Sequence, residues 1–276
     1  MSNQKSSVKP SSKFTNIFAS LVILLAVIAG QLIFHFVLGD PSHFEGGDNT
    51  KHPLSGDYLG MMYKGGVIVP FLMAVFMIVV ATVIERFITL SIASGKGSIP
   101  SFVQKIKGFL DNNQVDSAIS ECDKQRGSVA NVIREGLRKY KDMAGNNSLD
   151  KEQKVLAIQK EIEESTSLEL PMLEKNLVIL ATISSVATLL GLLGTVFGMI
   201  KAFSAIATAG APDAVQLSNG ISEALINTAL GIGSSAIAII FYNYFIAEVN
   251  RMVTEMEASV SDLVLLLVAE KKKHEV

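Results

Sequence analysis

The stretch NLVILATISSVATLLGLLGTVFGMI, residues 176–200, decides the fold of this chain. It runs for twenty-five residues without a charged side chain, whereas a helix needs only about 20 mostly apolar residues to cross a bilayer. It therefore predicts a transmembrane helix. A second uncharged run lies between Glu223 and Glu248, and its length predicts another transmembrane helix.

Both predicted helices carry a face of small and hydroxyl-bearing residues. These residues recur at alternating steps of three and four, which puts them on one side of a helix. In the first helix they are Ala181, Ser184, Thr188, Gly191, Thr195, Gly198 and Ala202, and in the second Ala224, Thr228, Gly231, Ser235 and Ala238. Lipid tails are better matched by Leu or Ile, so this face is expected to meet protein or water.

The residues alone leave two interpretations of the small face open. It could be a packing surface between helices, for which the candidates are Gly191, Gly194, Gly198 and Gly231. It could also line an ion path, for which the candidates are Thr188, Thr195, Glu223, Asn227, Thr228 and Ser235. Glu223 favours the ion path, because an acidic residue in or beside a membrane span is costly and usually marks function. A structural role for Glu223, in orienting helices or pairing with a cation, stays open beside it.

Composition indicates an integral membrane protein. The chain has 276 residues, 49% of them hydrophobic, and a mean hydropathy of +0.39. A net charge of −2 gives no electrostatic case for nucleic acid. The single cysteine, Cys122, excludes an internal disulfide, the four histidines lack metal-ligand spacing, and no nucleotide-binding motif is present. We expect no metal, no cofactor and no enzymatic activity.

The expected fold is all-α: a polytopic membrane protein with long helices that extend into the cytoplasm and a small cytoplasmic helical domain. The expected order is a disordered cytoplasmic tail (1–13), a transmembrane helix (14–39), a periplasmic loop (40–64), a transmembrane helix (65–90), a cytoplasmic helical region (91–175), a pore-lining transmembrane helix (176–205), a periplasmic turn (206–215), a second pore-lining transmembrane helix (216–247) and a cytoplasmic C-terminal helix (248–276). Basic residues inside support this topology. The first apolar run is longer than a usual signal-peptide core, which favours a retained span over a cleaved one.

Apolar periodicity predicts three short helices in the cytoplasmic region, over 101–111, 114–125 and 128–143. Asp150 with Gln153 resembles a capping arrangement at the start of a long charged helix. We expect that helix to continue into the membrane at 176, with a bend near Pro171 where a backbone hydrogen bond is lost.

The two pore-lining segments resemble the paired membrane helices of the MotA/TolQ/ExbB proton-channel family, most closely its ExbB branch. The resemblance is carried by GLLGTV at 191–196 and by EALxxTAxG at 223–231 with YN at 242–243. GVIVPFLMAVFMIVVATVIERFITL, at 66–90, also resembles the first span of that family with its ER exit. The first span at 14–39 is extra to the usual three-span pattern.

The resemblance implies a homo-oligomeric ring, a pentamer in the family, in the bacterial inner membrane. The ring would surround two copies of a single-span partner of the ExbD or TolR type, which carries an intramembrane Asp, and a TonB-like protein is a further expected partner. Such a motor converts proton-motive force into mechanical work for outer-membrane transport. A TolQ-like subunit, a flagellar-type stator and a passive membrane scaffold are the alternatives.

The family's channel threonines fall on Thr195 and Thr228, and its motif glutamate falls on Glu223. Two departures from the family pattern matter. Thr188 stands where relatives commonly carry Pro, and Asn227 stands where the ExbB branch often has Ala. Both departures enlarge the polar lining, so the choice between H⁺ and Na⁺ as the coupling ion stays open.

Overall fold

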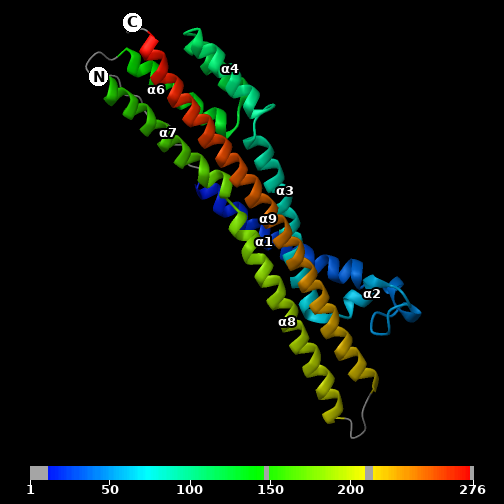
Figure 1. Cartoon of the computed structure of the whole chain (residues 1–276). Coiled ribbons are helices and arrows are strands. Elements are labelled where there is room, and N and C mark those ends of the chain that lie inside the picture. Colours follow the sequence, from blue (N-terminus) through cyan, green and yellow to red (C-terminus); the bar gives the residue numbers. More distant parts are fainter. Residues whose placement is uncertain (1–11, 146–148, 209–213, 274–276) are drawn as a thin grey trace. The chain divides into compact units, whose positions relative to one another are not determined.

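The computed structural model describes residues 12–145, 149–208 and 214–273, in which all regular structure is helical (Figure 1). The long helices are α1 (Ser12–Ile33), α3 (Val69–Ala93), α7 (Lys151–Glu174), α8 (Leu177–Thr208) and α9 (Ala214–Lys273), and the shorter ones are α2 (Tyr58–Tyr63), α4 (Ile99–Asp111), α5 (Val115–Gln125) and α6 (Ser128–Ala144). Within these ranges no strand forms, and a single isolated bridge joins Phe44 to Pro53. The expected all-α class is thus confirmed for this part of the chain. The expected tail, apart from its last two residues, and the centre of the expected periplasmic turn lie outside it.

The chain divides into two compact units. The first contains the residues up to Thr82 together with Ile179–Phe241, and the second contains Val83–Val178 and the chain from Tyr242 onward. The α3 and α9 helices therefore contribute residues to both units. Each unit is described on its own below.

Three helical stretches in the described residues are long and apolar enough to cross a membrane. They are Gly66–Ala93, Glu152–Ala207 and Ala214–Ser261, of which the second is interrupted between α7 and α8. Val22–Leu38 is a shorter apolar helix. The expected fourth span at 14–39 therefore stays a prediction. Its helix begins at Ser12 and ends in a π-helical turn, Phe34–Leu38.

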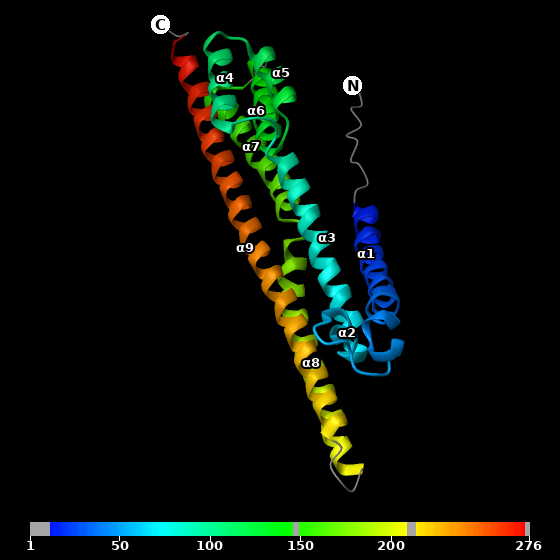
Figure 2. The same ribbon diagram turned by 90° about the vertical axis from the view of Figure 1, so that its right-hand side faces the viewer.

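In the first unit, α1 approaches the start of α3 closely (Figure 2). A Cβ atom on Gly30 would lie only 2.6 Å from the Pro70 carbonyl oxygen, so the two backbones meet where only hydrogen fits. Pro70 itself is the second residue of α3, where its missing N–H costs no helical hydrogen bond.

The expected loop at 40–64 contains local structure that the sequence analysis did not predict. Asp57 caps α2 by accepting hydrogen bonds from the backbone N–H groups of Leu59 and Gly60, both at 3.0 Å. Nδ1 of His43 lies 2.7 Å from the other carboxylate oxygen of Asp57. The hydrogen bonds from Gly60 and His43 lower the pKa of Asp57.

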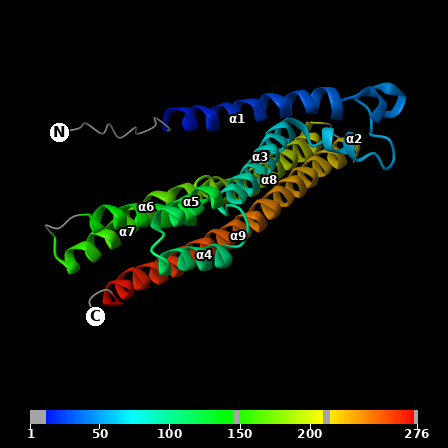
Figure 3. The ribbon, with the colours of Figure 1, turned by 90° about the horizontal axis from the view of Figure 1, so that it is seen from above.

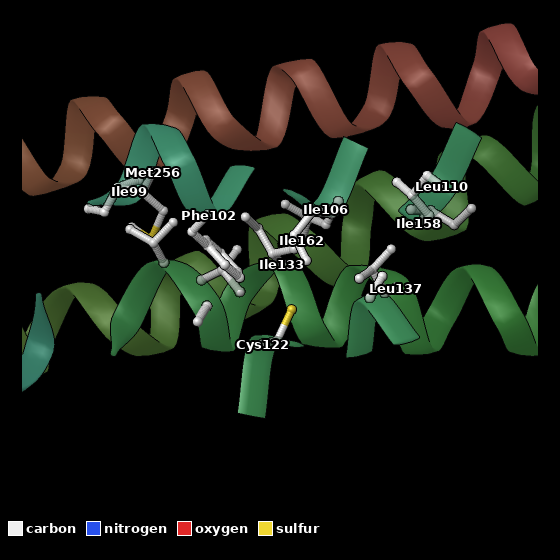
Figure 4. Packing of buried hydrophobic residues seen from close by; sticks show 14 residues of the cluster. Ile99, Phe102, Ile106, Leu110, Cys122, Ile133, Leu137, Ile158, Ile162 and Met256 are labelled. Atoms are coloured by element: carbon white, nitrogen blue, oxygen red, sulfur yellow. The ribbon is translucent and has the colours of Figure 1, made fainter. Parts of the chain in front are cut away.

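The second unit has an apolar core formed by α4 to α7 and the C-terminal part of α9 (Figure 4). The predicted short helices are confirmed as α4, α5 and α6, and Figure 3 shows α5, α6 and α7 lying together. The labelled core residues are Ile99, Phe102, Ile106, Leu110, Cys122, Ile133, Leu137, Ile158, Ile162 and Met256. The predicted capping arrangement is also confirmed, because Asp150 and Gln153 form a reciprocal capping box at the start of α7.

The prediction of a continuous helix through residue 176 was wrong. The α7 helix contains Pro171 and ends at Glu174, and Asn176 adopts a left-handed conformation (φ 65°) before α8 begins. Asn and Asp enter this region more easily than other side chains that carry a Cβ. The chain therefore breaks after Glu174, three residues beyond Pro171.

An ion pair on α3, between buried Arg86 and half-buried Glu85, holds this break in place. Arg86 is 1% exposed and donates to both carboxylate oxygens of Glu85, with Nε–Oε2 and Nη2–Oε1 distances of 2.8 and 2.6 Å. Nη1 of Arg86 also donates to the Leu173 carbonyl oxygen (3.2 Å), and the Asn176 side chain donates to Glu85 (3.2 Å). The carbonyls at a helix C-terminus have no partner within the helix, and Arg86 supplies one.

We predict that Leu137→Ala opens the core of the second unit. Leu137 has no exposed surface, and truncating a buried leucine costs about 2–5 kcal/mol. Cys122 reports the opening, because it is the only cysteine, it is 1% exposed, and burial raises the pKa of its thiol to about 12. A thiol reagent should label the variant about tenfold faster or more than the unchanged chain, since about 1.4 kcal/mol corresponds to a factor of ten.

Leu168→Ala is the matched control, because Leu168 is 69% exposed in the same unit. Its labelling rate should equal that of the unchanged chain. Labelling of the unchanged chain at the rate of a free thiol would show that this core is wrongly assigned.

Candidate functional site

The site is built on the hairpin of α8 and the first half of α9, which run side by side (Figure 1). Their backbones touch at Gly191 and Gly231: a Cβ on Gly191 would lie 3.1 Å from the Gly231 Cα, and a Cβ on Gly231 2.7 Å from the Gly191 Cα. Nearer the hairpin loop, a Cβ on Gly198 would lie 2.6 Å from the backbone nitrogen of Ala224. Small residues allow membrane helices to approach this closely.

The small face that the sequence analysis singled out divides into two parts. Its glycines and most of its alanines are buried between α8 and α9; these are Gly191, Gly198, Ala202, Ala224, Gly231 and Ala238. Gly194, a predicted packing residue, is also buried, and a Cβ there would collide with the Asn227 side chain. The hydroxyl-bearing members Thr188, Thr195, Thr228 and Ser235 are half-buried. Ser184, the remaining hydroxyl-bearing member, is buried. The structure therefore places the glycines at the centre of the face, and the threonines and Ser235 at its edge.

Two hydroxyl pairs bridge the helices at this edge. The Thr195 and Thr228 hydroxyls are hydrogen-bonded to each other, and Ser184 and Ser235 are paired at 3.2 Å. Thr195 can also donate to the Gly191 carbonyl oxygen (3.2 Å) and Thr228 to the Ala224 carbonyl oxygen (3.1 Å). Each hydroxyl has one proton, so the threonine pair has alternative donor arrangements. A pair of this kind can exchange hydrogen-bond direction without moving a backbone.

Thr188 carries a further half-buried hydroxyl on α8. Its side chain donates back to the Ser184 carbonyl oxygen at 3.3 Å, one helical turn earlier. It thereby satisfies its donor within α8.

Asn227 lies inside the packing. It has no exposed surface, and its Nδ2 donates to the Gly65 carbonyl oxygen at 2.8 Å. That bond ties α9 to the residues just before α3, while its Oδ1 has no hydrogen-bond partner. In this chain Asn227 therefore anchors α9 to the residues before α3.

Glu223 is paired with a lysine. Nζ of Lys201 lies 2.7 and 2.8 Å from the two carboxylate oxygens. The Glu223 side chain is only 11% exposed, whereas that of Lys201 is 55% exposed. Gly66 (φ 75°) presses against the same carboxylate and leaves no room for a side chain. Of the roles left open for Glu223, the structure displays pairing with a cation.

Lys201 is absent from the predicted site residues, although the sequence holds a signal for it. It is the first charge after the uncharged run 176–200. In an antiparallel hairpin that packs Gly198 against Gly220 and Ala224, a side chain at 201 falls beside 223. If the small residues of α8 and α9 are paired across the hairpin, their register places residue 201 beside residue 223.

The ion pair borders a polar cleft of about 640 Å³. The polar and charged residues that line it are His52, Lys64, Lys201, Ser204, Gln216, Ser218, Asn219, Ser222 and Glu223. No group of three or more His, Cys, Asp or Glu side chains in the described residues is arranged to hold a metal ion.

The chain resembles known proteins over this same region. The model of the MotA/TolQ/ExbB proton channel family matches residues 124–258. The Tol-Pal system protein TolQ of Pseudomonas aeruginosa is 25% identical over 160 residues, which cover 58% of this chain and 69% of that protein. The biopolymer transport protein ExbB of Pseudomonas putida is 28% identical over 222 residues, which cover 78% of this chain and 64% of that protein.

A putative ExbB homolog of Methanothermobacter thermautotrophicus is 26% identical over 203 residues, which cover 73% of this chain and 67% of that protein. The chain thus spans about two thirds of the length of these relatives. An α8–α9 hairpin with small residues at its centre and hydroxyls at its edge is a membrane helix pair suited to ion transport. Over residues 124–258 the chain is similar to the MotA/TolQ/ExbB proton channel family.

We predict that Gly231→Ala disrupts the hairpin while Gly233→Ala does not. A Cβ on Gly231 would meet the Ala187 carbonyl oxygen and the Gly191 Cα, both at 2.7 Å, whereas a Cβ on Gly233 meets nothing within 4 Å. Overpacking of this kind costs about 1–3 kcal/mol. Alanine at an open helical position is favoured over glycine by up to about 1 kcal/mol.

The melting temperature of the detergent-purified chain distinguishes the two variants. Gly231→Ala should melt below the unchanged chain, and Gly233→Ala at or above it. Equal melting of both variants would contradict the backbone contact between α8 and α9.

Proposed function

We propose that the chain is an ExbB-like subunit of an inner-membrane motor that converts proton-motive force into mechanical work for outer-membrane transport. The observation that carries the proposal is the Thr195–Thr228 hydroxyl pair, which bridges α8 and α9 at the half-buried edge of their contact. This edge offers polar groups to whatever lies beside the hairpin. An aqueous or titratable neighbour, and not lipid alone, is the environment that it suits.

We propose that several copies of the chain, five as in the family, form a ring. Apolar side chains on α8 stay exposed in the single chain, among them Leu189 (63%), Val196 (54%), Ile200 (55%) and Phe203 (62%). Lipid and neighbouring copies together would cover such a surface. The hydroxyl edges would then face the centre of the ring.

We propose that the ring holds two copies of a single-span ExbD- or TolR-like protein, with a TonB-like protein as a further partner. The sequence from Leu177 to Ile200 has no acidic residue, and in α9 none lies between Glu223 and Glu248. A titratable group at mid-membrane must therefore come from another chain. The names of the relatives, a biopolymer transport protein and a Tol-Pal system protein, fit an assembly of this kind.

In this mechanism the threonine hydroxyls pass or stabilise a proton that moves to and from the carboxyl group of the partner. Neutralising that carboxyl lowers the cost of moving it past an apolar wall. The membrane potential supplies about 2.3 kcal/mol per charge per 100 mV. Protonation would thereby gate movement of the partner inside the ring. In this arrangement 91–175 and 248–276 lie in the cytoplasm, and 40–64 and 206–215 in the periplasm.

A TolQ-like role is the second candidate, because TolQ of Pseudomonas aeruginosa matches 160 residues of the chain. The two roles differ in the single-span protein that accompanies the chain. Purification from its native membrane, followed by identification of that protein, separates an ExbD-type from a TolR-type partner.

We predict that Thr195→Val and Thr228→Val lower proton flux while leaving assembly intact. Valine keeps the shape of threonine and removes the hydroxyl, so the bridge between the helices is lost. A tenfold lower flux corresponds to about 1.4 kcal/mol, the scale of one hydrogen bond. Flux is measured with a pH-sensitive dye in vesicles that hold the chain and its single-span partner, and assembly by size-exclusion chromatography.

Thr195→Ser keeps the hydroxyl and should retain most of the flux. Thr254→Val, which removes an exposed hydroxyl bonded to Asn250 in the second unit, is the matched control. Full flux in both valine variants at positions 195 and 228 would overturn the role of the hydroxyl pair. A passive scaffold predicts that outcome.

A further inference from the structure

We propose that Lys201 is a built-in counter-ion that closes the Glu223 carboxylate to metal cations, and that it thereby sets which ion the proposed motor can use. The consequence for the motor depends on the proposed function. The pairing itself is a property of the isolated chain. It is tested there without a partner, a membrane potential or transport.

In this geometry the Lys201 ammonium group contacts both oxygens of the Glu223 carboxylate. Nζ of Lys201 lies within 2.8 Å of both Oε1 and Oε2 of Glu223. The backbone at Gly66 covers the same group from another side, so that only 11% of the Glu223 side chain stays exposed. A metal ion could reach these oxygens only by displacing the ammonium group.

The cleft beside the pair would otherwise suit a cation. Hard cations such as Na⁺ and Ca²⁺ prefer carboxylate, hydroxyl and amide oxygens. The cleft of about 640 Å³ supplies these groups from Gln216, Ser218, Asn219 and Ser222, next to Glu223. Without Lys201 the cleft would contain one uncompensated, mostly buried carboxylate, which is an unfavourable state unless a cation fills the place.

The other lysine of the cleft does not face the carboxylate. Nζ of Lys64 donates to the carbonyl oxygens of Asn49 and Thr50, at 2.9 and 3.1 Å. Its charge is therefore directed to the loop before α3. Lys201 and Lys64 line one cleft and differ in what they bind, which makes Lys64 a matched control.

The covalent attachment of Lys201 to the chain favours its ammonium group over free metal ions at Glu223. Its ammonium is held at high effective concentration beside Glu223, so a free metal ion competes poorly. The pair therefore excludes metal ions from the Glu223 carboxylate.

The test is the melting temperature of the detergent-purified full chain in sodium chloride and in choline chloride at equal ionic strength. The unchanged chain, Lys201→Arg and Lys64→Met should melt at the same temperature in both salts. Lys201→Met should melt roughly 3–8 °C lower in choline chloride than in sodium chloride. Its melting temperature should rise to a plateau as sodium replaces choline. Lys201→Met combined with Glu223→Gln removes both charges and should lose the sodium response.

Two results would overturn the proposal: a Lys201→Met variant that does not respond to sodium, or an unchanged chain that does. If Lys201→Met does not fold, Lys201→Gln gives the same comparison with a polar side chain. The outcome is independent of the flux experiment. Full flux in the threonine variants would refute the proposed function and leave the sodium response intact, and an absent sodium response would leave the threonine result unchanged.

Discussion

The contact on which the first unit depends is the backbone approach of α8 to α9 at Gly191 and Gly231. A hypothetical Cβ on Gly231 would lie 2.7 Å from the Gly191 Cα, which leaves no room for a side chain there. Lipid supplies no hydrophobic drive for helix association, so close packing and interhelical hydrogen bonds must do so. The same approach brings the Thr195 and Thr228 hydroxyls within bonding distance. Packing and a polar edge are thus two results of one arrangement.

The amino-acid sequence predicts most of the helices, because burial follows the helical period. The short helices α4, α5 and α6 came from apolar periodicity, and the capping box at Asp150 from two side chains three residues apart. The small face came from the same periodicity. Periodicity does not give the partner of a face, and the contact between Gly191 and Gly231 is visible only in the structure.

The features that the sequence analysis missed depend on residues far apart in the chain. The break at Asn176 is held by Glu85 and Arg86, about ninety positions earlier. A local rule placed the bend at Pro171, since proline removes a helical hydrogen bond. The Lys201–Glu223 pair likewise joins two helices across a hairpin turn. Neither feature has a short motif, and each follows only from the register of helices against one another.

Two buried polar side chains, Asn227 and Arg86, share a task, which is to satisfy backbone at places where a helix starts or stops. Asn227 donates to the Gly65 carbonyl oxygen before α3, and Arg86 to the Leu173 carbonyl oxygen near the end of α7. Such carbonyls have no helical partner, and in a bilayer an unsatisfied one costs several kcal/mol. Side chains fixed in this way cannot also serve a moving ion. The hydroxyls at the α8–α9 edge carry no such duty to another helix end, and this freedom supports the ion path that we propose for them.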